Sequence, residues 1–183
     1  NLILNFSKLL NQKATHTPSA QHVLDEEYYK RIEAIQFTME HDDGMKTKDI
    51  KSADIILLGV SRTSKTPTSI YLANRGYKTL NIPLVGKHEL PSMLKEKPDN
   101  FCVVGLSVEA ERLSDIRNNR LEAMKERKIH NYSDLNFIRK EIENSKNLFK
   151  KYNWPVIDVT KKSVEETAAS IVRIFDIKKR KKK

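Results

Sequence analysis

The amino-acid sequence predicts an α/β fold: a parallel sheet with flanking helices, in which the first core strand leads into a P-loop-like turn and then a helix. From residue 54 onward, short β-branched apolar runs alternate with segments of helical periodicity, a pattern typical of a parallel sheet covered on both faces. A length of 183 residues and a hydrophobic content of 38% suffice for one core. At one junction, Gly, Lys and Thr stand in the order that phosphate-binding loops use.

Two elements are predicted before the sheet. Apolar residues such as Tyr28 and Ile32 recur at helical spacing in residues 24–37, and acidic residues occupy the first turn, where the helix dipole favours them. Residues 41–44, His-Asp-Asp-Gly, are polar and end in Gly, which is typical of a turn. The breaker cluster at residues 16–19 indicates a loop or linker.

The alternating part of the chain begins with a continuous apolar run, which is typical of a strand buried on both faces. Four strands are predicted, at residues 55–58, 77–85, 101–106 and 154–160. Helices are predicted at residues 69–74, 109–124, 133–148 and 163–175. Ser163 and Glu166 match a capping box at the start of the last helix. The segment 86–100, rich in Pro, Lys and Glu, is interpreted as a loop.

Composition excludes several classes of protein. The longest apolar run, residues 55–60, is far shorter than the ~20 residues of a membrane-spanning helix. A single cysteine, Cys102, excludes an intramolecular disulfide, and its place in an apolar strand favours a core position. The five histidines show no close metal-ligand spacing, so a zinc site is not expected.

Much of the positive charge lies at the C-terminal end. The chain has 34 Lys and Arg residues against 24 Asp and Glu, a net charge of +10, and residues 178–183 are all basic. Without those six, 28 basic residues face 24 acidic ones, a net charge of +4. We expect a solvated, disordered tail. Binding of this tail to nucleic acid or anionic lipid is the less favoured interpretation.

Residues 59–66 carry the strongest chemical signal. The usual phosphate-loop pattern is G-x-x-x-x-G-K-[ST], and Gly59, Lys65 and Thr66 match it, whereas Ser64 stands where the second Gly belongs. The flanking strand and helix favour phosphate binding over a polar turn that merely contains a Lys. The predicted nucleotide-binding residues are Gly59, Val60, Ser61, Arg62, Thr63, Ser64, Lys65 and Thr66.

A longer pattern surrounds this loop. It comprises residues 53–67, 71–73 and 76–78, with further segments at 22–25, 31–35, 41–44, 105–107, 111–120 and 154–160. Over residues 20–175 the chain resembles the regulatory proteins of pyruvate, phosphate dikinase and phosphoenolpyruvate synthase. The dikinase branch of that family has Thr-Ser before the loop Lys, whereas the synthase branch has Cys-Gly. Thr63-Ser64 therefore resembles the dikinase branch.

The resemblance implies a bifunctional enzyme. Such an enzyme uses ADP to phosphorylate, and thereby inactivate, a threonine of the dikinase, with AMP as product. It removes that phosphate by attack of inorganic phosphate, which releases pyrophosphate. The implied partners are the dikinase, ADP and Mg²⁺, together with phosphate and pyrophosphate, while a homodimer stays open and nucleic acid and membrane are not expected. A bacterial cytoplasm is favoured over a chloroplast stroma.

The resemblance also implies a division of the chain, because whole family members carry an additional N-terminal domain. Residues 1–45 are interpreted as a remnant of that domain with a connecting helix. Residues 46–177 are interpreted as the P-loop-like α/β domain, and residues 178–183 as a basic tail.

Candidate roles follow from this implied chemistry. Lys65 and the loop amides hold the diphosphate, Thr66 contacts Mg²⁺, and Arg62 is a second positive clamp. Asp42 or Asp43 is the candidate proton acceptor for the threonine hydroxyl, since an Asp performs that task in phosphotransferases. The alternative is that both are ordinary turn residues.

Weaker candidates lie outside the loop. Arg117 and Arg120 stand at i, i+3 on a predicted helix and could form a fork for a phosphate, or lie on a solvated face. Asp158, near the end of the fourth strand, could hold a Mg²⁺-bound water or cap a turn. Two alternative enzymes remain: the same chemistry directed at phosphoenolpyruvate synthase, and an ATP-dependent small-molecule kinase.

Overall fold

The computed structural model describes residues 2–13, 25–44, 49–84, 90–124 and 132–181, and it confirms an α/β fold with a four-stranded parallel sheet. The spatial order is β2-β1-β3-β4, with strands β1 (Ile55–Gly59), β2 (Thr79–Pro83), β3 (Val103–Ser107) and β4 (Val156–Asp158). The helices are α1 (Leu2–Leu10), α2 (Glu26–Glu40), α3 (Lys65–Ala73), α4 (Ser92–Glu96), α5 (Ala110–Met124), α6 (Leu135–Lys151) and α7 (Val164–Lys181). None of the helices in these ranges is long and apolar enough to cross a membrane.

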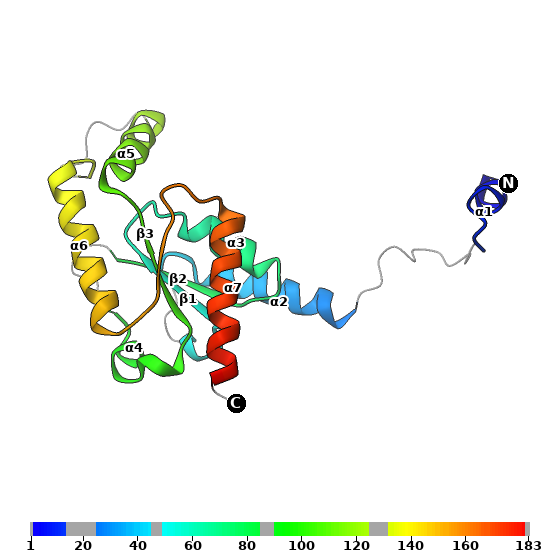
Figure 1. The fold of residues 1–183 in the computed structure, drawn as a ribbon, viewed down its shortest axis with the longest axis horizontal. Helices are drawn as coiled ribbons and strands as arrows, with labels where there is room; N and C mark the ends of the chain where they lie inside the picture. Colours follow the sequence, from blue (N-terminus) through cyan, green and yellow to red (C-terminus); the bar gives the residue numbers. More distant parts are fainter. Residues whose placement is uncertain (1, 14–24, 45–48, 85–89, 125–131, 182–183) are drawn as a thin grey trace.

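Helices cover both faces of the sheet (Figure 1), with α3 and α7 on one side and α6 on the other. Ile56 and Leu58 of β1 pack in one cluster with Phe149 of α6, whereas Leu57 packs in another with Ile171 of α7. Successive side chains of a strand point to opposite faces. The continuous apolar run of β1 therefore fills two core layers at once.

Helix α2 packs on the same unit, against α3 and β2. Its buried residues are Ala34 and Thr38, and the Thr38 hydroxyl accepts a hydrogen bond of 3.1 Å from the backbone N–H of Thr79. The helix itself was predicted, but its buried face was not: Ile32 is 46% exposed and Tyr28 is 37% exposed.

Some boundaries differ from the prediction. The segment 86–100 is not all loop, because its described part contains α4 and a 3₁₀ turn, η3 (Pro98–Asn100), and α4 buries Leu94 completely. The third strand begins only at Val103, so Cys102 precedes it, although Cys102 is buried. The fourth strand is limited to three residues.

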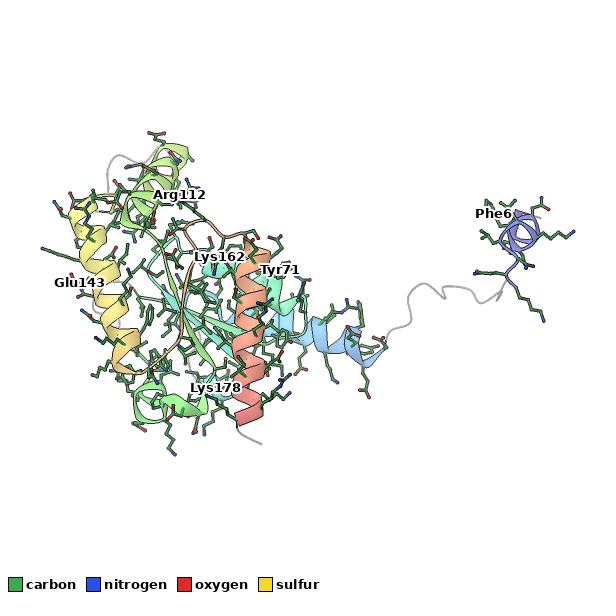
Figure 2. All side chains as sticks on the ribbon, in the orientation of Figure 1. Phe6, Tyr71, Arg112, Glu143, Lys162 and Lys178 are labelled. Carbon is green, nitrogen blue, oxygen red and sulfur yellow. The ribbon has the colours of Figure 1, made fainter. Side chains whose placement is uncertain are left out.

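The last helix begins with the predicted capping box. The Glu166 N–H donates to the Ser163 hydroxyl, and the Glu166 carboxylate accepts from the Ser163 N–H. The expected disordered tail is wrong for residues 178–181, because α7 continues through Lys181. Lys178, at the opposite end of α7 from Lys162 (Figure 2), donates to the Phe101 carbonyl, which attaches this end to the segment that precedes β3. Residues 182–183, like the linker predicted at 16–19, lie outside the described ranges.

Candidate functional site

The turn between β1 and α3 is tightly closed at its first residue. Gly59 ends β1, and a Cβ at this position would lie 2.7 Å from the Thr63 hydroxyl oxygen and 2.8 Å from the Leu106 carbonyl oxygen. The Thr63 hydroxyl also donates to the Val60 carbonyl at 3.0 Å. Only glycine fits here without displacing the backbone of β3.

Two residues of the turn adopt left-handed backbone conformations. Arg62 has a φ of 70° and Ser64 a φ of 58°. Ser64 occupies the position where phosphate loops usually have glycine, and its conformation gives the physical reason for that preference. Its carbonyl accepts from the Thr68 N–H, so the helix α3 starts directly after the turn. The first N–H groups of a helix, with the positive end of its dipole, favour an anion at this point.

Lys65 is buried at the start of α3. Its side chain is only 5% exposed, and Nζ donates to the Val60 carbonyl at 2.9 Å. Burial lowers the pKa of Lys65 to about 8, against the opposing effect of the Asp43 and Asp42 carboxylates, while Arg117 and Arg62 lower it further. The loop thus holds a desolvated ammonium that an incoming anion would stabilise.

This burial predicts a pH dependence of stability. The pKa of Lys65 is about 8 in the folded protein and 10.5 without burial, so between these values the unfolded chain binds more protons. The free energy of unfolding therefore rises with pH between these two values, by about 3 kcal/mol in total. Comparison of wild type with Lys65→Met by urea denaturation from pH 7 to 10.5 measures it: the rise should be missing in the variant. Parallel curves for both proteins would contradict the assignment.

A turn that precedes β1 in the chain brings Asp42 next to Thr66, at the start of α3. Asp42 and Asp43 lie in the 3₁₀ turn η1 (Asp42–Gly44), which packs against the end of β2. The Asp42 carboxylate accepts from the Thr66 hydroxyl at 3.2 Å and from the side-chain amide of Asn81 at 2.5 Å. Asn81 was not predicted. Its only sequence signal is a polar residue inside an apolar strand.

Asp43 instead faces an open pocket. Its φ of 51° turns the chain at this point, and its side chain is exposed. The pocket has a volume of about 300 Å³ and is lined by Asp43, Ser61, Arg62, Ser64, Lys65, Thr66, Pro67, Pro83 and Ile116. It therefore combines two cations, a carboxylate and a helix N-terminus in a space at the lower end of the range of small-molecule sites.

Arg117 is a buried residue of α5 that contacts the backbone of the loop. It is 1% exposed, pairs with Glu141 of α6 at 2.7 Å and donates to the Tyr132 carbonyl at 2.9 Å and the Ser61 carbonyl at 3.3 Å. Arg120, its predicted partner in a phosphate fork, is exposed. The two arginines thus occupy different environments, and Arg117 supports the turn through its backbone.

Tyr132 and Glu141 are further site residues that the sequence did not reveal. The Tyr132 hydroxyl accepts from Arg62 Nε at 3.4 Å, and its ring lies under the Arg117 guanidinium, 4.8 Å from ring centre to Cζ. Partial burial acts to raise the pKa of Tyr132, but hydrogen bonds with Arg62 and Ser61 and the two arginine charges lower it overall. Tyr132 therefore contacts both arginines, while Glu141 pairs with Arg117.

Asp158 is held by its own turn. Its carboxylate accepts from the Thr160 N–H at 2.8 Å and from the Thr160 hydroxyl at 2.5 Å, and these bonds lower the pKa of Asp158. It is not among the residues that line the pocket. The structure thus gives it the turn-capping contacts that were one of its two predicted roles.

The Thr66 hydroxyl and the Asp42 carboxylate would be the protein ligands of a divalent cation beside the loop. Mg²⁺ prefers oxygen ligands at 2.0–2.1 Å in an octahedron, which separates neighbouring ligands by roughly 2.9 Å. The Thr66 hydroxyl and the Asp42 carboxylate oxygen lie 3.2 Å apart. The described residues include no cluster of three or more His, Cys, Asp or Glu side chains suited to a metal, so the remaining ligands would come from water and substrate phosphates.

Comparison with known proteins identifies related chains. A family model described as kinase/pyrophosphorylase matches residues 1–172. A protein of Pelagibacter ubique (strain HTCC1062) named "Putative pyruvate, phosphate dikinase regulatory protein" is 66% identical over 179 residues, which cover 98% of this chain and 65% of the relative. A protein of the same name from Erythrobacter litoralis (strain HTCC2594) is 51% identical over 91% of this chain and 60% of its own length. This chain thus spans about three-fifths of the length of these relatives.

Proposed function

Because the chain belongs to the kinase/pyrophosphorylase family, we propose that it carries the phosphoryl-transfer site of a bifunctional regulator of pyruvate, phosphate dikinase. In one direction, the threonine hydroxyl of the dikinase attacks the β-phosphorus of ADP. A new P–O bond forms, the bond between the β-phosphorus and its bridging oxygen breaks, and AMP leaves with that electron pair. In the other direction, an oxygen of inorganic phosphate attacks the phosphothreonine, and the products are pyrophosphate and the free threonine. The names of the relatives support regulation of pyruvate, phosphate dikinase. We expect a bacterial cytoplasm as the compartment.

The observation that carries this proposal is the pocket in which Lys65, Arg62 and Asp43 meet at the start of α3. Phosphoryl transfer needs positioning and neutralisation of charge more than covalent help from the protein. Lys65 and the first N–H groups of α3 would hold the two linked phosphoryl groups, and Arg62 would contact the group in transfer. Thr66 and Asp42 would hold Mg²⁺, which supplies further neutralisation of the phosphate oxygens.

Both directions place the same atoms across the loop. In the first reaction, the two linked phosphoryl groups of ADP lie in line with the threonine oxygen. In the second, inorganic phosphate and the phosphoryl group of the phosphothreonine lie in line with the same oxygen, and these two groups become the linked pair of pyrophosphate. One set of cationic residues therefore serves both reactions, and one carboxylate, Asp42 or Asp43, would take the threonine proton in the first and return it in the second.

The test is transfer to the purified dikinase, phosphorylated on its catalytic histidine. We expect Mg²⁺ and ADP labelled at the β-phosphate to label one threonine, located by mass spectrometry, with AMP formed in equal amount. Added phosphate should then release pyrophosphate. Parallel reactions with phosphoenolpyruvate synthase and with ATP in place of ADP distinguish the alternatives. Labelling of the synthase alone, or transfer from ATP alone, would contradict the proposal.

A further inference from the structure

Asn81 joins three parts of the candidate site. It lies inside β2, is fully buried, and its backbone N–H approaches the His41 carbonyl at 3.4 Å. Its side-chain NH₂ donates to the Asp42 carboxylate at 2.5 Å and to the Thr66 hydroxyl at 3.1 Å. One side chain thus fixes the turn η1 and the first turn of α3 relative to each other.

The other atom of this amide is unsatisfied. Asn81 Oδ1 is buried and has no hydrogen-bond partner within the described ranges. An unpaired buried amide oxygen costs free energy, so such an atom in a folded protein calls for a partner. The NH₂ group of this amide, not Oδ1, faces the Asp42 carboxylate and the Thr66 hydroxyl. The oxygen atoms of these two side chains are of the donor type that a hard divalent cation prefers.

Asp42 and Asp43 differ in what holds them. Oδ1 of Asp42 already accepts two hydrogen bonds, and the carboxylate is half-buried beside Asn81. In the described part of the chain, no hydrogen bond or ion pair holds the Asp43 carboxylate, which is exposed and lines the pocket. A proton acceptor must reach the incoming hydroxyl with a lone pair that is not already engaged. Asp43 meets this condition, and of the two carboxylates it alone is among the residues that line the pocket.

We infer that the two carboxylates have separate tasks: Asp42, positioned by Asn81, binds the divalent cation together with Thr66, and Asp43 exchanges the proton with the acceptor hydroxyl. This inference rests on the proposed function. As the β-phosphoryl group passes to the threonine oxygen, the hydroxyl proton moves to Asp43 and AMP leaves. In the phosphate-dependent reaction, Asp43 gives a proton to the departing threonine oxygen as pyrophosphate forms. Asn81 is a positioning residue and takes no proton.

Mn²⁺ titration of the protein with ADP, followed by electron paramagnetic resonance, separates these tasks without relying on turnover. We expect Asp42→Asn and Asn81→Ala to weaken Mn²⁺ binding by about 10- to 100-fold. Asp43→Asn should leave it within about twofold. Asp99→Asn is the matched control, because Asp99 is exposed in η3, before β3, and should change nothing.

Transfer to the dikinase completes the test. Asp43→Asn should lower both directions of transfer by about 10²- to 10⁴-fold at any Mg²⁺ concentration. In Asp42→Asn and Asn81→Ala, raised Mg²⁺ should recover most of the activity. If Asn81→Ala does not fold, as judged by circular dichroism, Asp42→Asn alone decides the cation site.

Two results would overturn the inference: weakened Mn²⁺ binding in Asp43→Asn equal to that in Asp42→Asn, or unchanged Mn²⁺ binding in Asp42→Asn. Absence of transfer by the wild-type chain would refute the proposed function and with it the task of Asp43. The Mn²⁺ titration would still decide the task of Asp42, so the two failures are distinguishable.

Discussion

Lys65→Ala is expected to reduce phosphoryl transfer by about 10²- to 10³-fold, because it removes a preorganised positive charge from the place where the transferred group develops its charge. The affinity for ADP should fall by about 10- to 100-fold, the range for loss of a charge-assisted hydrogen bond. Within the described part of the chain, the buried ammonium donates to the Val60 carbonyl alone, so its charge is available to a phosphate. Calorimetry with ADP and the transfer reaction measure the two effects separately.

The control for this variant is Lys162→Ala. Lys162 is exposed in the connection between β4 and α7 (Figure 2) and does not line the pocket, so its loss removes the same charge from the surface. We expect ADP affinity and transfer close to those of the wild type. Equal losses in both variants would show that net charge matters and would remove Lys65 from the site.

Arg117→Met should destabilise the fold by about 3–5 kcal/mol, because it leaves the carboxylate of Glu141 without its cation in a nearly buried position. Arg117 is 1% exposed and the Glu141 side chain 16%, at an N–O distance of 2.7 Å. The Ser61 and Tyr132 carbonyls lose a donor in the same variant. Urea denaturation measures the loss, and ADP binding shows whether the loop remains in place.

The α5–α6 contact contains its own matched control. Arg139 and Glu111 join the same two helices at the same distance of 2.7 Å, but their side chains are 56% and 64% exposed. Water screens such a pair, so Arg139→Met should leave the free energy of unfolding nearly unchanged. The double variant Arg117→Met with Glu141→Leu should regain part of the lost stability, because no unpaired charge remains. Equal effects of the two Arg variants would contradict the role of burial.

The fold was predictable because its signals are local. A run such as residues 55–58 indicates a buried strand wherever it occurs, and the strand-helix alternation then leaves few topologies. The predictions that were wrong, for segment 86–100 and for the C-terminal tail, also have local causes. Helix α4 has five residues, too few for a periodic pattern. Lys and Arg in residues 178–181 are good helix formers that continue α7: Lys178 donates to the Phe101 carbonyl, and the side chains of residues 179–181 are exposed to water.

The candidate site was predictable only where it is contiguous in the chain. Gly59, Lys65 and Thr66 form one short pattern, although their binding of a diphosphate stays a prediction. Asn81 and Glu141 reach the loop only through the folded sheet and the α5–α6 contact, which no local spacing reports.

Arg117 is an intermediate case. It stands four residues from Leu113 on one side and four from Leu121 on the other, and both leucines are buried, so this spacing marks the inward face of α5. The pairing of Arg117 with Arg120 used the i, i+3 spacing alone, which does not tell which face of a helix packs against its neighbour.

The order of the strands in the sheet also affects the rate and the sequence of events in folding. The paired residues Ile55 and Thr79 are 24 positions apart, Ile56 and Val103 are 47 apart, and Gly105 and Val156 are 51 apart. No pairing is a hairpin, so each closes a long loop before it gains stabilisation, and such topologies fold slowly. Gly59 reaches its close contact with Leu106 only after β3 has joined β1. During synthesis, the turn between β1 and α3 therefore takes its final shape only after nearly fifty further residues have emerged.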